Sequence, residues 1–175
     1  MDKEKIVFVP SCLLCPLMMA RKDRADASWS QEIISYLIEK GYFMIQMPCP
    51  EASFPDHATG IARKPHGLKY YQELSGFRDY CSDIGKQVLE QIDAFYDNGY
   101  KISAVLGVEH SPACAVNYIY TNQGTKRMRG IFIQQLSNLI KERGYDIAMV
   151  GINRHHPQKT VEYLEKYQRR NEEQS

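Results

Sequence analysis

The sequence predicts an α/β protein: a three-layer, Rossmann-like sandwich built on a four-stranded parallel sheet. Short apolar runs alternate four times with longer segments whose apolar residues recur at helical spacing. Four βα units in succession require helices on both faces of a parallel sheet. A chain of 175 residues is also long enough to bury a core without disulfides or metal. We therefore expect one α/β domain over residues 1–175.

Residues 6–47 contain the first βα unit and the second strand. Residues 6–10 form a short apolar run, IVFVP, which predicts a strand. In residues 30–40, Ile33, Ile34, Leu37 and Ile38 recur at helical spacing, and Gly41 directly follows as a helix stop. The second strand is expected at 42–47.

The second helix and the last two βα units follow the long segment 48–75. The helix expected at 77–98 carries Phe77, Cys81, Ile84, Val88, Ile92 and Phe95 on one face. A strand at 102–107 precedes a helix at 127–143, which Gly144 ends. A strand at 146–151 leads to a last helix that opens at Pro157, a residue favoured in the first helical turn.

Residues 48–75 contain several prolines and glycines and show no clear periodicity. Structureless loops of this length are uncommon in compact domains and are usually functional. In a parallel sheet, ligands bind at the carboxyl ends of the strands. We expect loops 10–29, 48–75 and 108–126 to form a catalytic edge there, although a surface excursion without a role is the alternative for 48–75.

Composition narrows the class of partner. Lys and Arg number 22 against 21 Asp and Glu, so the net charge of +1 lacks the footprint of a nucleic-acid binder. No apolar stretch resembles a signal peptide or reaches the length of a membrane span. We expect a cytoplasmic protein with a small-molecule partner, and neither a nucleic acid nor a membrane. In that compartment five cysteines indicate metal binding, catalysis or burial more than disulfides.

Three cysteines follow three of the expected strands. Cys12 comes after KIVFVP, Cys49 after FMIQMP, and Cys114 after SAVLGV and EHSPA. Because the carboxyl ends of parallel strands share one edge, these thiols can converge. Three thiolates without a fourth suit a metal or iron–sulfur cluster that keeps one coordination position open, as catalytic sites do.

The other two cysteines have weaker signals. Cys15 completes a C-x-x-C with Cys12, whose usual intracellular meanings are a redox pair or half of a zinc site. The chain contains no second C-x-x-C and no H-x-x-x-H, and Cys15 can equally be a buried small hydrophobe. Cys81 lies on the apolar face of its helix, which predicts core packing.

Groups that can move protons flank Cys49 and Cys114. Glu51 lies two residues after Cys49, and Glu109, His110 and Ser111 lie shortly before Cys114. A carboxylate there can act as a general base toward water, and a serine can relay a proton. Glu51 is the stronger candidate, because a strand-end residue such as Glu109 or His110 is often only a solvated or capping side chain. Four further histidines are candidates by position: His57, His66, His155 and His156.

Five segments resemble, in order, motifs of the thiouracil desulfidase (TudS) family. They are PSCLL at 10–14, PCPE at 48–51, GIARKP at 60–65, SPAC at 111–114 and GIFIQQL from 130, with the later Gly144. The family has S-x-C-L-L-G, C-P-E, G-x-x-R-x-P, S-P-S-C-G and a G-x-x-x-x-x-L helix. The resemblance spans roughly residues 5–150. This chain departs from it at Cys15 and Ala115, where the family has glycine, and lacks the R-Y-D-G segment.

The resemblance implies a [4Fe-4S] cluster bound through Cys12, Cys49 and Cys114, with the fourth iron open to the sulfur of a small thiolated substrate such as a nucleobase. It further implies that Glu51 activates water and that Ser111 assists, giving C=O and sulfide from C=S. Two other interpretations of the protein's function are open. One is a non-catalytic iron–sulfur or metal-binding protein with Cys15 as fourth ligand. The other is a hydrolase with a Cys114 nucleophile and a histidine such as His110.

Overall fold

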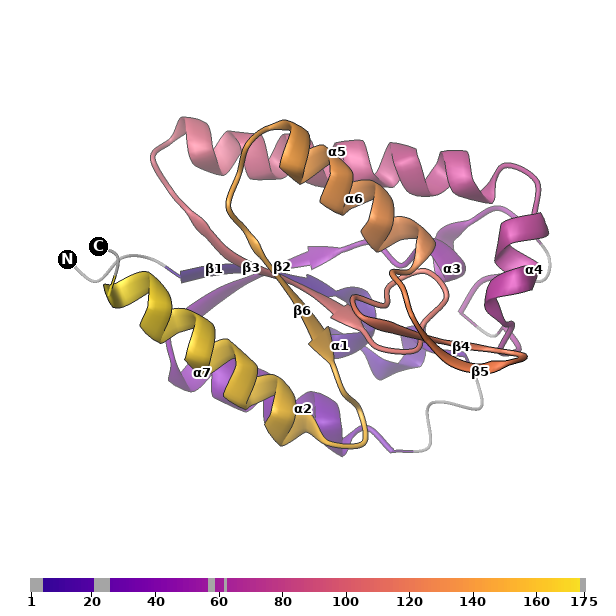
Figure 1. Ribbon diagram of the computed structural model, residues 1–175, viewed down its shortest axis with the longest axis horizontal. Coiled ribbons are helices and arrows are strands. Elements are labelled where there is room, and N and C mark those ends of the chain that lie inside the picture. The colour runs from indigo at the N-terminus through magenta and orange to yellow at the C-terminus, as the bar shows by residue number, and fades with distance from the viewer. Residues whose placement is uncertain (1–4, 21–25, 57–58, 62, 174–175) are drawn as a thin grey trace.

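The computed structural model describes residues 5–20, 26–56, 59–61 and 63–173. Its centre is a parallel sheet in the order β2-β1-β3-β6 (Figure 1). The strands are β1 (Lys5–Pro10), β2 (Tyr42–Met47), β3 (Ile102–Val108) and β6 (Ala148–Ile152). Helices cover both faces of this sheet, which confirms the predicted three-layer α/β architecture.

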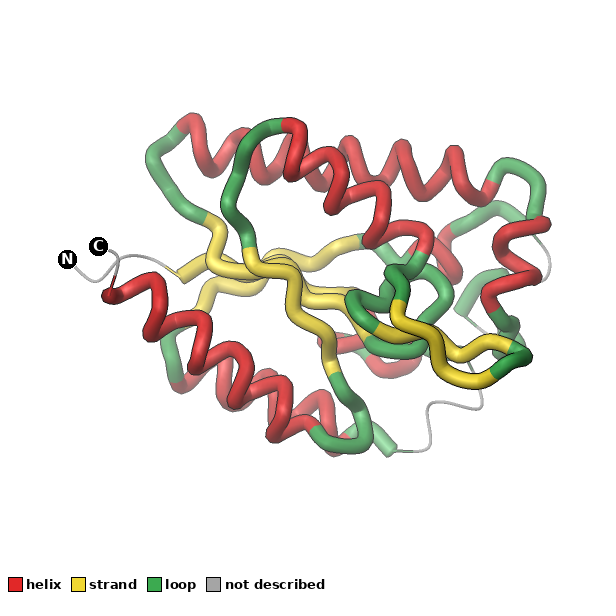
Figure 2. The backbone as a smooth tube through the Cα atoms, viewed as in Figure 1, coloured by secondary structure: helices red, strands yellow, loops and turns green. Residues whose placement is uncertain are grey.

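Two pairs of helices form the outer layers. One face carries α5 (Phe77–Asp97) and α6 (Ile131–Glu142), and the other carries α2 (Ser28–Glu39) and α7 (Pro157–Glu173) (Figure 2). Strand β1 divides its side chains between them, because successive residues of a strand point to opposite faces. Ile6 and Phe8 join the core beneath α5 and α6, whereas Val7 and Val9 join the core beneath α2 and α7. None of the helices in the described part of the chain has both the length and the apolar character of a membrane span.

Short elements gather beyond the carboxyl ends of the strands (Figure 1). After β1 come α1 (Ser11–Leu14) and the 3₁₀ turn η1 (Pro16–Met18), and after β2 come α3 (Pro50–Ser53) and α4 (Leu68–Glu73). After β3 comes an antiparallel hairpin of β4 (Tyr118–Thr121) and β5 (Gly124–Arg127). Described parts of the three segments 10–29, 48–75 and 108–126, which were expected to form a catalytic edge, contribute these short elements.

The structure corrects three boundaries. Segment 48–75 contains α3 and α4, which are four and six residues long and thus too short to show a helical period. The helix expected from 127 begins at Ile131, because residues 124–127 form β5, whose four residues are all exposed and carry no apolar alternation. The last strand covers 148–152 instead of 146–151, since its pairing with β3 starts at Ala148.

Candidate functional site

Cys12, Cys49 and Cys114 follow three neighbouring strands. Cys12 lies in α1 directly after β1, and Cys49 is the N-cap residue of α3 after β2. Cys114 lies in the turn after β3. Because β2, β1 and β3 are adjacent and parallel, the segments that follow them share one edge. The fold therefore places these three residues at one edge of the sheet.

The three thiols are close enough to act on one another electrostatically. Although Cys12 and Cys49 keep some exposed surface, removal of sulfur from water raises the pKa of Cys12 to about 12 and that of Cys49 to about 11. Cys49 adds to the shift at Cys12, and Glu51 adds to both. Burial also raises the pKa of Cys114 well above its usual value, with further contributions from Cys49, Glu51, Cys12 and Cys81. A positively charged centre among the sulfurs would reverse this preference, because a coordinated thiol is deprotonated.

Serine side chains fix the turn that carries Cys12. The Ser11 hydroxyl donates to the carbonyl of Met47 at 2.5 Å and joins α1 to the end of β2. The Ser30 hydroxyl, from α2, donates to the carbonyl of Leu13 at 2.5 Å. Both serines are buried, so these bonds replace contacts with water. Cys12 is therefore held between the strand that precedes Cys49 and the helical layer below.

The turn that carries Cys114 is built around Ser111. The Ser111 oxygen accepts hydrogen bonds from the backbone N–H groups of Cys114 at 2.9 Å and Ala113 at 3.3 Å. The carbonyls of Pro112 and Ala113 in turn accept N–H groups from the first turn of α6, at 2.9 to 3.2 Å. These bonds satisfy orphan donors at the helix start and fix the orientation of the turn.

Glu51 is a buried carboxylate with partners on both oxygens. Ser111 Oγ donates to Oε1 at 2.9 Å. On Oε2, the Tyr71 hydroxyl donates at 3.2 Å and Arg63 Nε donates at 3.3 Å. Glu51 is only 8% exposed, and these bonds compensate for its removal from water. The carboxylate thus links α3 to the Cys114 turn through one oxygen and is anchored through the other.

Arg63 and Tyr71 are site residues that the sequence did not single out. Arg63 is 7% exposed, and its Nη1 donates to the carbonyls of Met18 at 2.8 Å and Gly60 at 3.1 Å. Its Nη2 lies 3.9 Å from Cys49 Sγ. Arg63 lies in the GIARKP segment, which resembles a family motif but to whose arginine the sequence assigns no role. Tyr71, on the short helix α4, had no periodic signal.

Glu109 has a structural role. Its carboxylate accepts hydrogen bonds from the backbone N–H groups of Asn117 and Tyr118 and from the Asn117 side chain, at 2.7 to 3.2 Å. It lies against Gly151 of β6, where an added Cβ would come within 1.7 Å of Oε1. These contacts tie the start of β4 to the sheet and occupy the oxygens that a general base would use.

His110 lies beside the Cys114 turn without bonding to it. Its φ is 68°, and its ring stacks on Tyr120 of the hairpin with centroids 3.8 Å apart. Nδ1 is buried without a partner, and burial, aided by Arg154, lowers the pKa of His110 despite the opposing effect of Glu109. Within the described residues no hydrogen bond joins His110 to Cys114, so the structure offers no preformed Cys–His pair for a hydrolase.

Three further histidines, His66, His155 and His156, lie in the described residues. His66 stacks on Tyr70 with centroids 3.9 Å apart. His155 and His156 are exposed, and their backbone N–H groups donate to the Asn153 side chain ahead of α7. His57 lies outside the described residues.

The two remaining cysteines, Cys15 and Cys81, have different surroundings. Cys15 is the exposed residue that follows α1, and its N–H donates to the carbonyl of Ser11. Because Cys15 is exposed, the alternative that it is a buried small hydrophobic residue is wrong. Cys81 is fully buried in the core beneath α5, which confirms the expected packing role.

The described residues contain no group of three or more His, Cys, Asp and Glu side chains arranged to hold a single metal ion. In a cubane cluster each thiolate binds a different iron.

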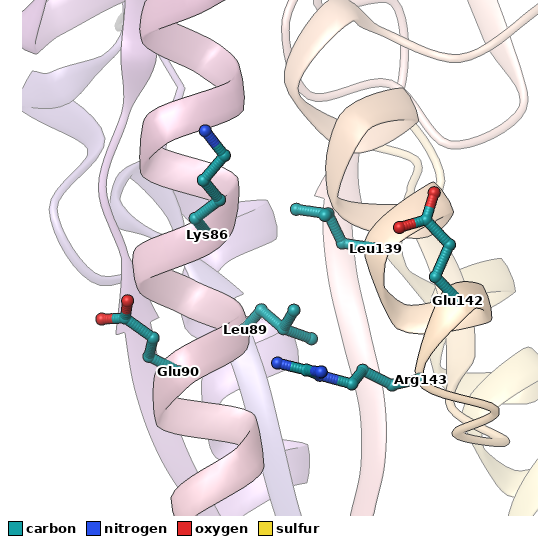
Figure 3. Close-up of a pocket in the computed structure, with 6 residues that line it drawn as sticks. All are labelled: Lys86, Leu89, Glu90, Leu139, Glu142 and Arg143. Carbon is teal, nitrogen blue, oxygen red and sulfur yellow. The ribbon is translucent and has the colours of Figure 1, made fainter.

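A recess of about 330 Å³ lies between α5 and α6, where Lys86, Leu89, Glu90, Leu139, Glu142 and Arg143 line it (Figure 3). None of the candidate site residues borders this recess.

Comparisons with known proteins give distant likenesses. An uncharacterized protein of Methanocaldococcus jannaschii is 26% identical over 125 residues, which are 70% of this chain and 73% of that protein. A solved structure of a [4Fe-4S]-dependent thiouracil desulfidase, TudS, matches at a TM-score of 0.46 and 19% identity, over 84% of this chain and 91% of its own. No protein-family model matches the chain.

Proposed function

We propose that this protein is a desulfidase that removes sulfur, as sulfide, from a small thiolated compound such as a thiolated nucleobase. Cys12, Cys49 and Cys114 would hold a [4Fe-4S] cluster. The observation that carries this proposal is the convergence of three buried or half-buried thiols beside the hydrogen-bonded pair of Glu51 and Ser111. The ordered motifs of the sequence, which resemble those of thiouracil desulfidases, support the same assignment.

The residues fit such a cluster in number and in chemistry. Three thiolates can occupy three corners of a cubane, and Cys15, exposed after α1, is left free of that role. Arg63 places a buried cation against Cys49, which offsets part of the negative charge of the thiolates.

The protein side chains would handle the proton transfers. When bound, the cluster would supply a Lewis-acidic iron to the substrate sulfur. Water adds to the carbon of the C=S group, sulfide leaves, and C=O forms, so the reaction needs no external electrons. Because Arg63 and Tyr71 occupy Oε2 of Glu51, we assign Oε1 as the oxygen that accepts the proton from water. Ser111, 2.9 Å from Oε1, would position the water or relay its proton.

The test is sulfide release by anaerobically reconstituted protein incubated with a panel of thiolated nucleobases and small thiolated heterocycles. We expect sulfide and the corresponding oxo product in equal amounts from at least one compound, and none with Cys114→Ala. Cluster-loaded protein that releases no sulfide from any compound would contradict the proposal. If the cluster of such an inactive protein is also lost in Cys15→Ala, the protein is a non-catalytic iron–sulfur protein with Cys15 as the fourth ligand.

A further inference from the structure

Arg63 connects three segments of the site through one guanidinium group. Nη1 binds the carbonyl of Met18 after β1, Nε binds Glu51 after β2, and a second bond from Nη1 reaches Gly60. Nη2 is left to face Cys49 Sγ at 3.9 Å. The side chain is 4% exposed, so its planar fork is held in one orientation with every donor nitrogen directed at a partner.

The charge of Arg63 is retained in this buried position. Burial favours the neutral form, but Glu51, Cys49 and Tyr71 act in the opposite sense, and the pKa of Arg63 lies above its ordinary value. Its Nη2 brings that charge to 3.9 Å from Cys49 Sγ.

An N–H group directed at a ligand sulfur changes an iron–sulfur centre in two ways. It stabilises the thiolate as a ligand, and it stabilises the reduced, more negative state of the cluster, which raises the reduction potential. A positive charge at the same distance acts in the same direction. Both effects require that the donor stay fixed against the sulfur, which the bonds to Met18, Gly60 and Glu51 ensure.

We propose that Arg63 is the positioning residue that holds Cys49 as a cluster ligand and sets the reduction potential of the cluster. The inference rests on the proposed cluster and extends it to a residue outside the ligand set. Lysine cannot replace the fork, because an ammonium is a point charge that cannot reach Met18, Glu51 and Cys49 along fixed directions. The role thus depends on geometry as well as on charge.

The experiment compares Arg63→Met, Arg63→Lys and the neighbouring exposed control Lys64→Met with the wild type. Each protein is reconstituted anaerobically, and its iron retention during chelator challenge and its midpoint potential are measured. We expect Arg63→Met to retain the cluster about 10–100-fold less well, the range typical of lost outer-shell partners, and to have a more negative potential. Arg63→Lys should fall between, and Lys64→Met should match the wild type.

The possible failures are distinguishable. A wild-type protein that cannot be loaded contradicts the proposed function itself. A loaded wild type with unchanged retention and potential in Arg63→Met overturns only the role of Arg63. If circular dichroism shows that Arg63→Met does not fold, Arg63→Lys decides, and wild-type values in that variant overturn the proposal.

Discussion

At the residue scale, the two oxygens of Glu51 have different surroundings. Oε2 takes one bond from a cation and one from a phenol, whereas Oε1 faces only the Ser111 hydroxyl among the bonds seen in the described residues. The first pair fixes the carboxylate plane. The second contact connects it to the turn that carries Cys114. One side chain can thus be both anchored and available for proton transfer.

Glu51→Gln tests this division. The amide is nearly isosteric, so the cluster and its visible spectrum should persist while sulfide release falls by about 10²–10⁴-fold, the contribution typical of general acid–base catalysis. Ser111→Ala should lower release as well. The matched control is Glu73→Gln, an exposed carboxylate on α4. Turnover close to wild type in Glu51→Gln would shift the proton transfer to another group.

The buried thiols also predict how the stability of the metal-free protein depends on pH. Burial raises the pKa of Cys81 from the ordinary 9.0 to about 12. Because the folded pKa is the higher one, the stabilisation is fully present below pH 9 and is lost as pH rises toward 12. Denaturant unfolding of the metal-free protein from pH 8 to 11 should show a smaller decline in free energy for Cys81→Ala than for wild type. Parallel curves for the two proteins would contradict the shift.

At the element scale, glycines allow the Cys114 turn to approach the sheet and α6. A Cβ at Gly107 of β3 would lie 2.1 Å from the carbonyl oxygen of Cys114. A Cβ at Gly130, the N-cap of α6, would lie 2.3 Å from the carbonyl carbon of Ala113 and 2.7 Å from the nitrogen of Cys114. These neighbours are backbone atoms and cannot rotate away. The position of Cys114 therefore depends on two residues without side chains.

Gly130→Ala should displace the Cys114 turn. We expect a loss of about 1–3 kcal/mol in the free energy of unfolding, the range of overpacking substitutions, together with reduced iron incorporation. Gly67→Ala is the control, because Gly67 caps α4 with φ −82° and a Cβ there meets nothing within 4 Å. Chemical denaturation and iron analysis of both variants check this. Equal stability and iron content in the two would remove the assigned role of Gly130.

The sequence predicts the long helices and strands, but not the short hairpin or the partners of Glu51. The long amphipathic helices and apolar strands were visible because they repeat a period over many residues. The hairpin at 118–127 was missed because each of its strands has only four residues and every residue of β5 is exposed. Arg63 and Tyr71 reach Glu51 through tertiary contacts, so neither the GIARKP motif nor any local periodicity indicates these bonds. Glu109, five residues before Cys114 in the sequence, bonds instead to the start of β4.

At the scale of the whole molecule, strand order creates the site. β1 lies between β2 and β3, so the segments after these three strands meet although they are far apart in sequence. The cysteines were predictable as a set because each follows a strand, and the general geometry of parallel sheets then places them together. The covering helices lie on the faces of the sheet and leave its carboxyl edge to the short elements (Figure 1).

The most direct test of the account is the iron and acid-labile sulfide content of the anaerobically reconstituted protein. Wild type and Cys81→Ala should each contain about four iron and four sulfide per chain, the composition of a [4Fe-4S] centre. Cys12→Ala, Cys49→Ala and Cys114→Ala should each fail to retain it, because the cluster would be left with two protein ligands. A colourless wild type that takes up neither iron nor sulfide would contradict the proposed [4Fe-4S] cluster. A cluster that survives loss of Cys49 but not of Cys81 would contradict its assignment to Cys12, Cys49 and Cys114.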